Sequence, residues 1–188
     1  MVNKLTTLYV LEPFLIKPHE QIHLAEIALA LNRPHPTIRQ HLALLEKDGI
    51  LKKNRKGKLS LYSLNFDNPS IVHYLTIAEK NVLIQKCKND LLLKELLHTL
   101  HTALTENNKA LIFGSATQLL KKANDIDLLI TGKISKEKIE EFSNKFNTQV
   151  HLINTEKLKD ITQALKEEIL KKHLLIQGSE EILRWLLW

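Results

Sequence analysis

The chain has 188 residues, of which 44% are hydrophobic, and its 37 Leu and 18 Ile suffice to build one medium domain or two small ones. A single cysteine, Cys87, excludes a disulfide framework and a cysteine-based zinc site, and the 26% charged residues, with no low-complexity tract, exclude wholesale disorder. Uncharged runs reach only 11 residues, below the ~18–20 of a membrane span, and no apolar secretion signal opens the sequence; we expect a cytoplasmic protein without membrane contact.

The first third of the chain is predicted to form three helices separated by short breaks. Apolar residues at helical spacing predict one helix that ends near Lys17 and a second over 25–31, joined by a short extended piece. The second helix ends at Asn32, a residue type that tolerates a left-handed turn. A third helix is expected over 36–47, because a proline can occupy its first turn. Its inner face carries Ile38, Leu42 and Leu45.

After Gly49 the hydrophobic period changes from helical to two, which predicts a β-hairpin with strands over 50–54 and 58–64 around a turn at 55–57. The hairpin carries five cations: Lys52, Lys53, Arg55, Lys56 and Lys58. Residues 1–90 hold 13 cations and 8 acids, and residues 91–188 hold 14 and 13, so most of the net charge of +6 lies in the first half. Such a cluster suggests contact with a polyanion, or a hairpin kept soluble by its lysines.

Helix, short strand, helix, turn, helix and basic hairpin is the order of a winged helix-turn-helix. The stretch 31–50, with its ending Leu-Glu-Lys-Asp-Gly-Ile, resembles the recognition-helix region of ArsR- and MarR-like winged-helix regulators, and 62–65 is similar to their wing strand. In such proteins a helix contacts base edges in the major groove and the wing contacts phosphates.

The resemblance implies that double-stranded DNA is a partner. On the outer face of the third helix the candidate DNA-binding residues are Thr37, Arg39 and Gln40, alongside the five hairpin cations. Arginine and glutamine can form bidentate pairs with guanine and adenine. The alternative is a winged helix that serves only as a protein–protein module.

Two further helices are predicted after a turn-rich break at 65–69. The first, over 71–88, either serves as a dimer arm or packs on its own domain. The second, over 91–106, has an apolar stripe of Leu93, Leu97, Leu100 and Leu104. Together, the two helices offer more apolar surface than one small winged domain can cover, which predicts a homodimer. His98 and His101 lie one turn apart, but without a third ligand nearby they are more typical of a surface pair than of a metal site.

From Lys109 onward, predicted strands and helices alternate, which indicates a small α/β module. The strands are expected over 110–113, 125–131, 150–154 and 174–177, and the helices over 115–122, 135–146, 161–172 and 179–188. The whole chain is therefore assigned to the α+β class, with a mixed sheet in its second part. The expected domains are 1–66 for the winged helix, 67–90 for a linker or dimerisation helix, and 91–188 for the second module.

Within the second module, Gly114-Ser115 is followed after nine residues by Asp125-Ile126-Asp127. Two carboxylates at i and i+2 on a strand share one face, where they can hold a hard divalent cation together. A Gly-Ser turn at the start of a helix offers backbone N–H groups and a hydroxyl to phosphate. These parts predict a site for a nucleoside triphosphate with Mg²⁺.

This pattern resembles the signature of the DNA polymerase beta nucleotidyltransferase superfamily, and the small size is similar to its minimal branch, often fused to winged helices in archaea. The resemblance implies nucleotide-binding roles for Gly114 and Ser115, and catalytic and metal-binding roles for Asp125 and Asp127. The superfamily has a third carboxylate on a later strand, where this chain offers only Gln149, Val150 and His151. The usual glycine-containing loop is also replaced, by 118–123.

Three functions compete on this basis. The first is a DNA-binding regulator whose nucleotidyltransferase-like domain binds Mg-nucleotide with weak or absent catalysis. The second is an active nucleotidyltransferase that transfers a nucleoside monophosphate to a protein, an RNA or a small molecule. The third is an antitoxin-like partner of a HEPN-type protein, because minimal nucleotidyltransferases are commonly paired in that way.

Overall fold

A computed structural model of the chain describes residues 7–120 and 125–188. The chain divides into two compact units, Met1–Glu79 and Lys80–Trp188, and the division falls inside helix α5 (Ile71–Asn89). The three-part division into 1–66, 67–90 and 91–188 stays a prediction. Among the described residues, no helix combines the length and the apolar character that a membrane crossing requires.

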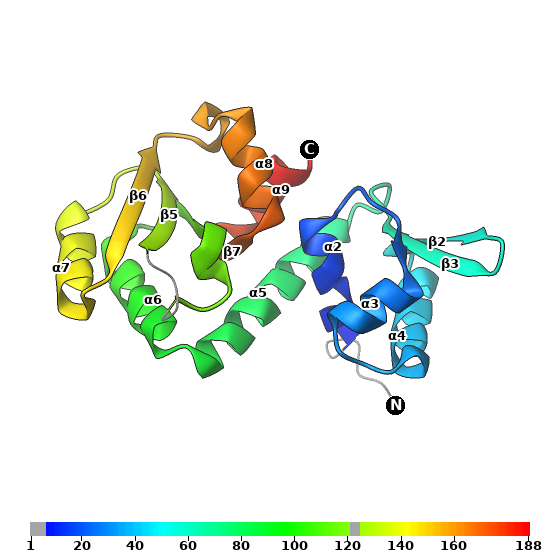
Figure 1. Cartoon of the computed structure of the whole chain (residues 1–188). Coiled ribbons are helices and arrows are strands. Elements are labelled where there is room, and N and C mark those ends of the chain that lie inside the picture. The colour runs from blue at the N-terminus through cyan, green and yellow to red at the C-terminus, as the bar shows by residue number, and fades with distance from the viewer. Residues whose placement is uncertain (1–6, 121–124) are drawn as a thin grey trace. The chain divides into compact units, whose positions relative to one another are not determined.

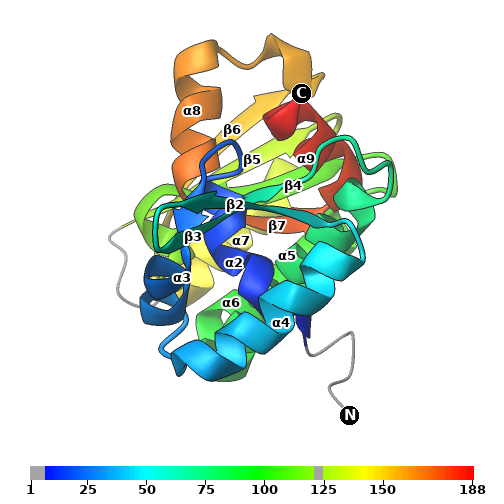
Figure 2. The same ribbon diagram turned by 90° about the vertical axis from the view of Figure 1, so that its right-hand side faces the viewer.

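The first unit consists of short helices and a three-stranded antiparallel sheet in the order β1-β3-β2 (Figure 1). Figure 2 shows the β2–β3 hairpin in front, with α3 and α4 below it in that view. The expected sequence of a winged helix-turn-helix is therefore present. Its elements are η1 (Leu8–Leu11), α2 (Glu12–Ile16), β1 (Ile22–His23), α3 (Leu24–Ala30), α4 (His35–Lys47), β2 (Leu51–Lys56) and β3 (Leu59–Leu64).

Left-handed residues end the helices where the sequence predicted. Asn32 has φ +49° after α3, and Gly49 has φ +69° after α4. The hairpin turn, by contrast, was predicted over 55–57 but lies at 57–58, so its predicted start is two positions too early. Arg55 pairs with Ser60 and Lys56 with Leu59, so both cations belong to β2 and the turn consists of the two residues that follow. Gly57, at φ +60°, supplies the conformation that such a two-residue turn requires.

The core of the first unit is formed by apolar side chains from every helix and from the sheet. Ile38, Leu42 and Leu45 of α4 are buried, as their helical spacing predicted. The first predicted helix is correct in position but begins as a 3₁₀ turn, and residues 1–6 lie outside the described part. The largest fully buried side chains here are Leu11, Phe14, Ile22, Ile27, Ile38, Leu42, Ile50, Tyr62, Ile71 and Leu75.

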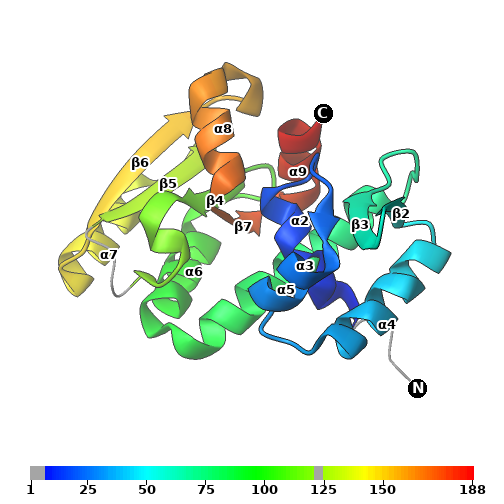
Figure 3. The same cartoon turned by 45° about the vertical axis from the view of Figure 1, so that its right-hand side comes forward.

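The second unit is a mixed four-stranded sheet in the order β6-β5-β4-β7 with helices packed on it. Strands β5 and β6 run parallel, and β4 pairs antiparallel with both β5 and β7. In Figure 3, β6 lies at the outer edge of this sheet, close to α7. Its elements after α5 are α6 (Leu91–Ala103), β4 (Lys109–Phe113), η2 (Gly114–Thr117), β5 (Asp125–Thr131), α7 (Lys136–Phe146), β6 (Gln149–Thr155), η4 (Leu158–Asp160), α8 (Gln163–Lys171), β7 (His173–Gln177) and α9 (Ser179–Leu187).

Several helices of this unit differ from their predicted ranges. The helix expected over 115–122 is only the short 3₁₀ turn η2 in its described part, because nearby backbone groups bond elsewhere: the N–H of Leu120 donates to Asp90 at 2.7 Å. Residues 121 and 122 lie outside the described part. Helix α6 ends at Ala103 rather than at 106, with Leu104 as its C-terminal cap.

The leucine stripe of α6 lies inside the second unit. Leu93, Leu96 and Leu100 are at most 1% exposed, and they pack with strand residues in one apolar cluster. Leu97, which the sequence placed in the stripe, is only partly buried and packs against that cluster. The stripe therefore covers the chain's own sheet and gives no support to the expected homodimer.

Candidate functional site

Helix α4 presents a polar face opposite its buried one. Arg39 and Gln40 are exposed and Thr37 is half-buried, while Ile38 between them is fully buried. These candidate base-contacting side chains therefore lie on the outside of the helix near its N-terminal end. This is the part of a recognition helix that reaches base edges in winged helix-turn-helix proteins.

The five cations of the hairpin fall into two groups. Lys52 forms an ion pair with Asp67 at 2.5 Å, and Lys53 lies 3.8 Å from a carboxylate oxygen of Glu46 and 5.6 Å from the centre of the Tyr62 ring. The Lys52 ammonium lowers the pKa of Asp67 by hydrogen bonding and by charge.

The other three cations lie towards the end of the hairpin. Arg55, Lys56 and Lys58 are exposed, and no acidic partner contacts them in the described part of the chain. We call these three residues the wing tip. Because no acid among the described residues neutralises their charges, they are the hairpin cations best suited to phosphate.

One buried titratable residue of α4 was missed in the sequence. His41 is 8% exposed; its Nδ1 lies 3.2 Å from Oγ1 of Thr7, and its ring meets the Tyr9 ring edge-on at 5.2 Å. Burial lowers the pKa of His41 below its ordinary value of 6.5. Its spacing of three from Ile38 and four from Leu45 was the signal that could have placed it inside.

We expect the first unit to lose stability as the pH falls through 6.5, the ordinary pKa of a histidine. Since folding lowers the pKa of His41, the unfolded chain binds more protons in this range, so the contribution is complete above it and decreases below it. His41→Asn, which keeps a polar atom near Thr7, should flatten this dependence. All three tyrosines lie in the first unit, so near-ultraviolet circular dichroism at tyrosine wavelengths can follow its unfolding. An equal pH dependence in both proteins would contradict the expectation.

The carboxylate pair lies at the start of β5, beside the Gly-Ser turn. Asp125 and Asp127 are both half-buried and alternate with the buried Ile126, so they share a face of the sheet. Gly114 has φ +71°, and a Cβ atom there would lie 2.7 Å from Oδ2 of Asp127. The structure thus brings three of the predicted residues together, and only glycine permits this approach. Ser115 follows and is exposed.

The strand register decides which residue occupies the position of the expected third acid. Asp125 pairs with Gln149 and Asp127 with His151 across the parallel strands. His151 donates from Nδ1 to Oδ1 of Asp127 at 3.3 Å, while Val150 belongs to the other face. Among residues 7–120 and 125–188, no group of three or more His, Cys, Asp or Glu has the arrangement of a metal site.

One backbone group of the turn is already engaged. The N–H of Gly114 donates to the carbonyl of Lys172 at 3.3 Å, and Oγ1 of Thr117 donates to the carbonyl of Gly114 at 2.8 Å. The Gly114 N–H is therefore not available to phosphate in this conformation, which differs from the expectation. The exposed hydroxyl of Ser115 is the remaining candidate side chain of the turn for a phosphate contact.

Gly114→Ala is expected to destabilise the second unit by more than the ~1–2 kcal/mol that a left-handed conformation costs a non-glycine residue. The additional cost arises because the new methyl group would meet the Asp127 carboxylate. In an Asp127→Ala background only the conformational cost should remain. Urea unfolding can measure the free energy of unfolding of all four proteins of this double-mutant cycle. Both tryptophans, Trp185 and Trp188, lie in this unit and report its unfolding by fluorescence. Equal costs in the two backgrounds would show that crowding is unimportant.

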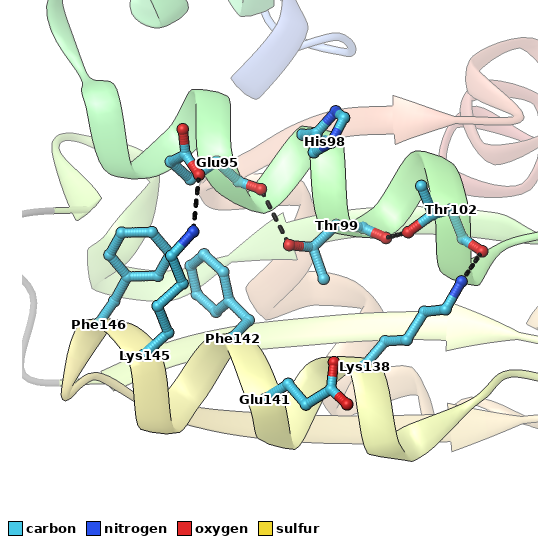
Figure 4. A pocket seen from close by; sticks show the side chains of 9 residues that line it. All are labelled: Glu95, His98, Thr99, Thr102, Lys138, Glu141, Phe142, Lys145 and Phe146. Atoms are coloured by element: carbon cyan, nitrogen blue, oxygen red, sulfur yellow. Dashed lines mark hydrogen bonds and ion pairs between the residues drawn. The ribbon is translucent and has the colours of Figure 1, made fainter.

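A groove of about 250 Å³ lies between α6 and α7 (Figure 4). Lys145 lies 3.5 Å from Glu95 across it, and Lys138 donates to the carbonyl of Thr102. His98 lines the groove, while its predicted neighbour His101 does not. Charges of both signs alternate along the groove, and the predicted nucleotide and metal residues lie elsewhere, so it adds no candidate chemistry.

No family model matches the chain. The arsenic resistance transcriptional regulator ArsR2 of Pseudomonas putida is 40% identical over 53 residues, which are 28% of this chain and 46% of that protein. The match thus spans about half of the regulator's length and confirms in part the resemblance to ArsR-like winged-helix proteins.

One solved structure also matches the chain. TrmBL2, an archaeal chromatin protein described as having a novel mode of DNA binding, aligns with 87% of this chain and 68% of its own, at 14% identity and a TM-score of 0.28. A TM-score this low does not show that the two chains share a fold. Neither comparison bears on the nucleotidyltransferase resemblance, which stays a prediction.

Proposed function

We propose that the first unit binds double-stranded DNA in the manner of a winged helix-turn-helix regulator. The observation that carries the proposal is the combination, in one compact unit, of an outward polar face on α4 and a hairpin whose wing-tip cations have no acidic partner among the described residues. The partial match to a transcriptional regulator supports it. Sequence specificity would come from base contacts of Arg39 and Gln40. Affinity for any duplex would come from phosphate contacts of the wing tip.

A titration of fluorescent duplex DNA at a series of salt concentrations tests this function. Binding should be strong at low salt and should decrease linearly in a plot of log affinity against log salt concentration, because neutralised phosphates release condensed counterions. Random duplexes measure the non-specific component, and selection from a random pool identifies a preferred site. Absence of duplex binding at low salt would refute the proposal.

For the second unit, we propose a Mg-nucleotide site at Asp125, Asp127 and Ser115. Mg²⁺ is commonly bound by one or two carboxylates together with substrate phosphates, so a pair of half-buried carboxylates fits the ion without a third acid. The close approach of Gly114 to Asp127 supports the site, since it leaves the carboxylate beside the turn. The bound Mg-nucleotide would then act as an effector of the regulator.

An active nucleotidyltransferase is the second candidate, favoured by the same carboxylate pair. In the described part of the chain, His151 occupies the place beside Asp127 where the superfamily has a third acid. A neutral imidazole is a weaker ligand than a carboxylate for Mg²⁺, so we expect slow or absent transfer. Incubation with labelled ATP, GTP, CTP and UTP in the presence of Mg²⁺ or Mn²⁺ separates the candidates: label transferred to an acceptor indicates an enzyme, and binding alone indicates a sensor.

A further inference from the structure

Strand β6 forms one edge of the sheet in the second unit, and its seven residues, Gln149–Thr155, include no charge, proline or glycine. Natural proteins commonly protect an edge strand with charged residues, prolines or bulges, because its unpaired backbone groups can add another strand. At the opposite edge, the carbonyl of Ile176 in β7 accepts a hydrogen bond from the Lys80 side chain at 2.7 Å. Among the described residues, no side chain donates in this way to a backbone carbonyl of β6.

The direction of the free backbone groups follows from the pairing with β5. In a parallel pair, alternate residues direct both their N–H and their C=O to the neighbouring strand. The carbonyl of Thr155 accepts from the N–H of Gly132 at 2.8 Å, so Thr155 and every second residue before it face β5. The intervening Val150, Leu152 and Asn154 therefore direct their backbone groups away from the sheet, and no backbone partner for them occurs within residues 7–120 and 125–188.

A groove runs beside this edge, between α7 and β6. It has a volume of about 190 Å³, and its apolar wall consists of Ile139, Val150 and Leu152. Lys136 and Glu140, of opposite charge, also line it. The groove lies on the same side of the sheet as the side chains of Val150 and Leu152, so a strand added at the edge would place its own alternate side chains there.

We propose that two copies of this chain join through β6, edge to edge and antiparallel, about a two-fold axis at Leu152. Residues of a hydrogen-bonded antiparallel pair exchange both backbone bonds. With Leu152 opposite Leu152 of the second copy, Val150 stands opposite Asn154 and Asn154 opposite Val150. Every outward N–H and C=O of the strand then has a partner, and the two sheets become one.

A second copy is favoured over an unrelated peptide because the strand is complementary to itself. No like charges meet in this register, since the strand has none, and like charges directly opposite would be destabilising. Leu152 of each copy lies beside the apolar wall of the other's groove. The interface includes none of the residues proposed to bind DNA, Mg²⁺ or the nucleotide. His151, which lies beside Asp127, is on the same strand, but its side chain lies on the sheet face opposite Leu152.

The two-fold axis at Leu152 permits a specific test by sedimentation velocity or light scattering on the full chain. The unmodified protein should be a dimer at micromolar concentration. Leu152→Glu and Leu152→Lys should each be monomeric, because each places two identical charges opposite one another. An equimolar mixture of the two variants should again form dimers, since unlike charges then meet; a variant that had merely unfolded would not do so.

Val150→Pro provides a second variant, since it removes an outward N–H that has no partner among the described residues of the monomer, and edge strands tolerate proline. It too should be monomeric, with unchanged tryptophan fluorescence. Ile84→Glu, on an exposed position of α5 (56% exposed), is the matched control and should remain a dimer. A monomeric unmodified protein would overturn the proposal, as would a dimer that Ile84→Glu dissociates and Leu152→Glu does not.

Discussion

Duplex binding should weaken several-hundred-fold at ~0.1 M salt when Arg55, Lys56 and Lys58 are all replaced with glutamine. This magnitude is expected because each phosphate contact changes the logarithm of the affinity by about 0.9 for a tenfold change in salt concentration. The effect should be equal for all DNA sequences, because phosphates carry no base information. The salt dependence should also decrease, by a slope of about 3. Fluorescence anisotropy of labelled duplexes over a salt series measures both quantities.

A charge-matched control distinguishes local contacts from net charge. Lys157, Lys159 and Lys171 of the second unit are exposed, and their replacement with glutamine lowers the net charge by the same amount. This control should leave the slope nearly unchanged. If both triple variants weakened binding equally, the wing tip would have no special role and the winged-helix proposal would lose its main support.

The neighbouring candidates should behave differently from the wing tip. Lys52→Gln should have a smaller effect than a wing-tip substitution, because Lys52 is already paired with Asp67. Arg39→Ala and Gln40→Ala should relax sequence preference, at about 1–3 kcal/mol per lost base contact, with little change in non-specific binding. A selected site is required for this comparison, since random duplexes report only the phosphate contribution.

The first unit could be predicted closely because its signals are local. The helix ends at Asn32 and Gly49 depend on residue types that adopt a left-handed conformation, and the change of period after Gly49 marks the hairpin. The turn was misplaced because alternation does not fix register: Arg55 and Lys56 extend the strand, and Gly57 alone in that turn has a positive φ.

The errors in the second unit arise from contacts between distant residues. The stretch after Gly114 has a helical pattern, but the Leu120 N–H bonds to Asp90, 30 residues earlier. The pairing of Asp127 with His151 depends on a strand register across 24 residues. Similarly, the leucines of α6 indicate an apolar face but not its partner, and the chain's own sheet covers it. Periodicity predicts a buried face, whereas only the fold shows what buries it.

Asp127→Asn is expected to lower the affinity for Mg-nucleotide by at least ~10–100-fold, the range observed when even an outer partner of a metal ligand is lost. The substitution keeps the shape of the side chain but removes one of the two charges that Asp125 and Asp127 present on one face. Isothermal titration with MgATP and the other three nucleotides measures the change. Glu156→Gln, which removes an exposed acid elsewhere in the same unit, is the matched control and should bind as the unmodified protein does.

His151 should be the residue that separates binding from transfer. Its imidazole donates to Asp127 and occupies the place beside it on β6, so His151→Ala should leave nucleotide affinity nearly unchanged. His151→Asp supplies the carboxylate that two-metal chemistry needs to hold a second ion and to accept the proton of the attacking hydroxyl. We expect this variant to increase the transfer of labelled nucleotide above the level of the unmodified protein. Robust transfer by the unmodified chain, lost in Asp127→Asn, would instead make it an enzyme in which His151 is already sufficient. If Asp127→Asn bound the nucleotide as tightly as the unmodified protein does, the proposed nucleotide site would be refuted.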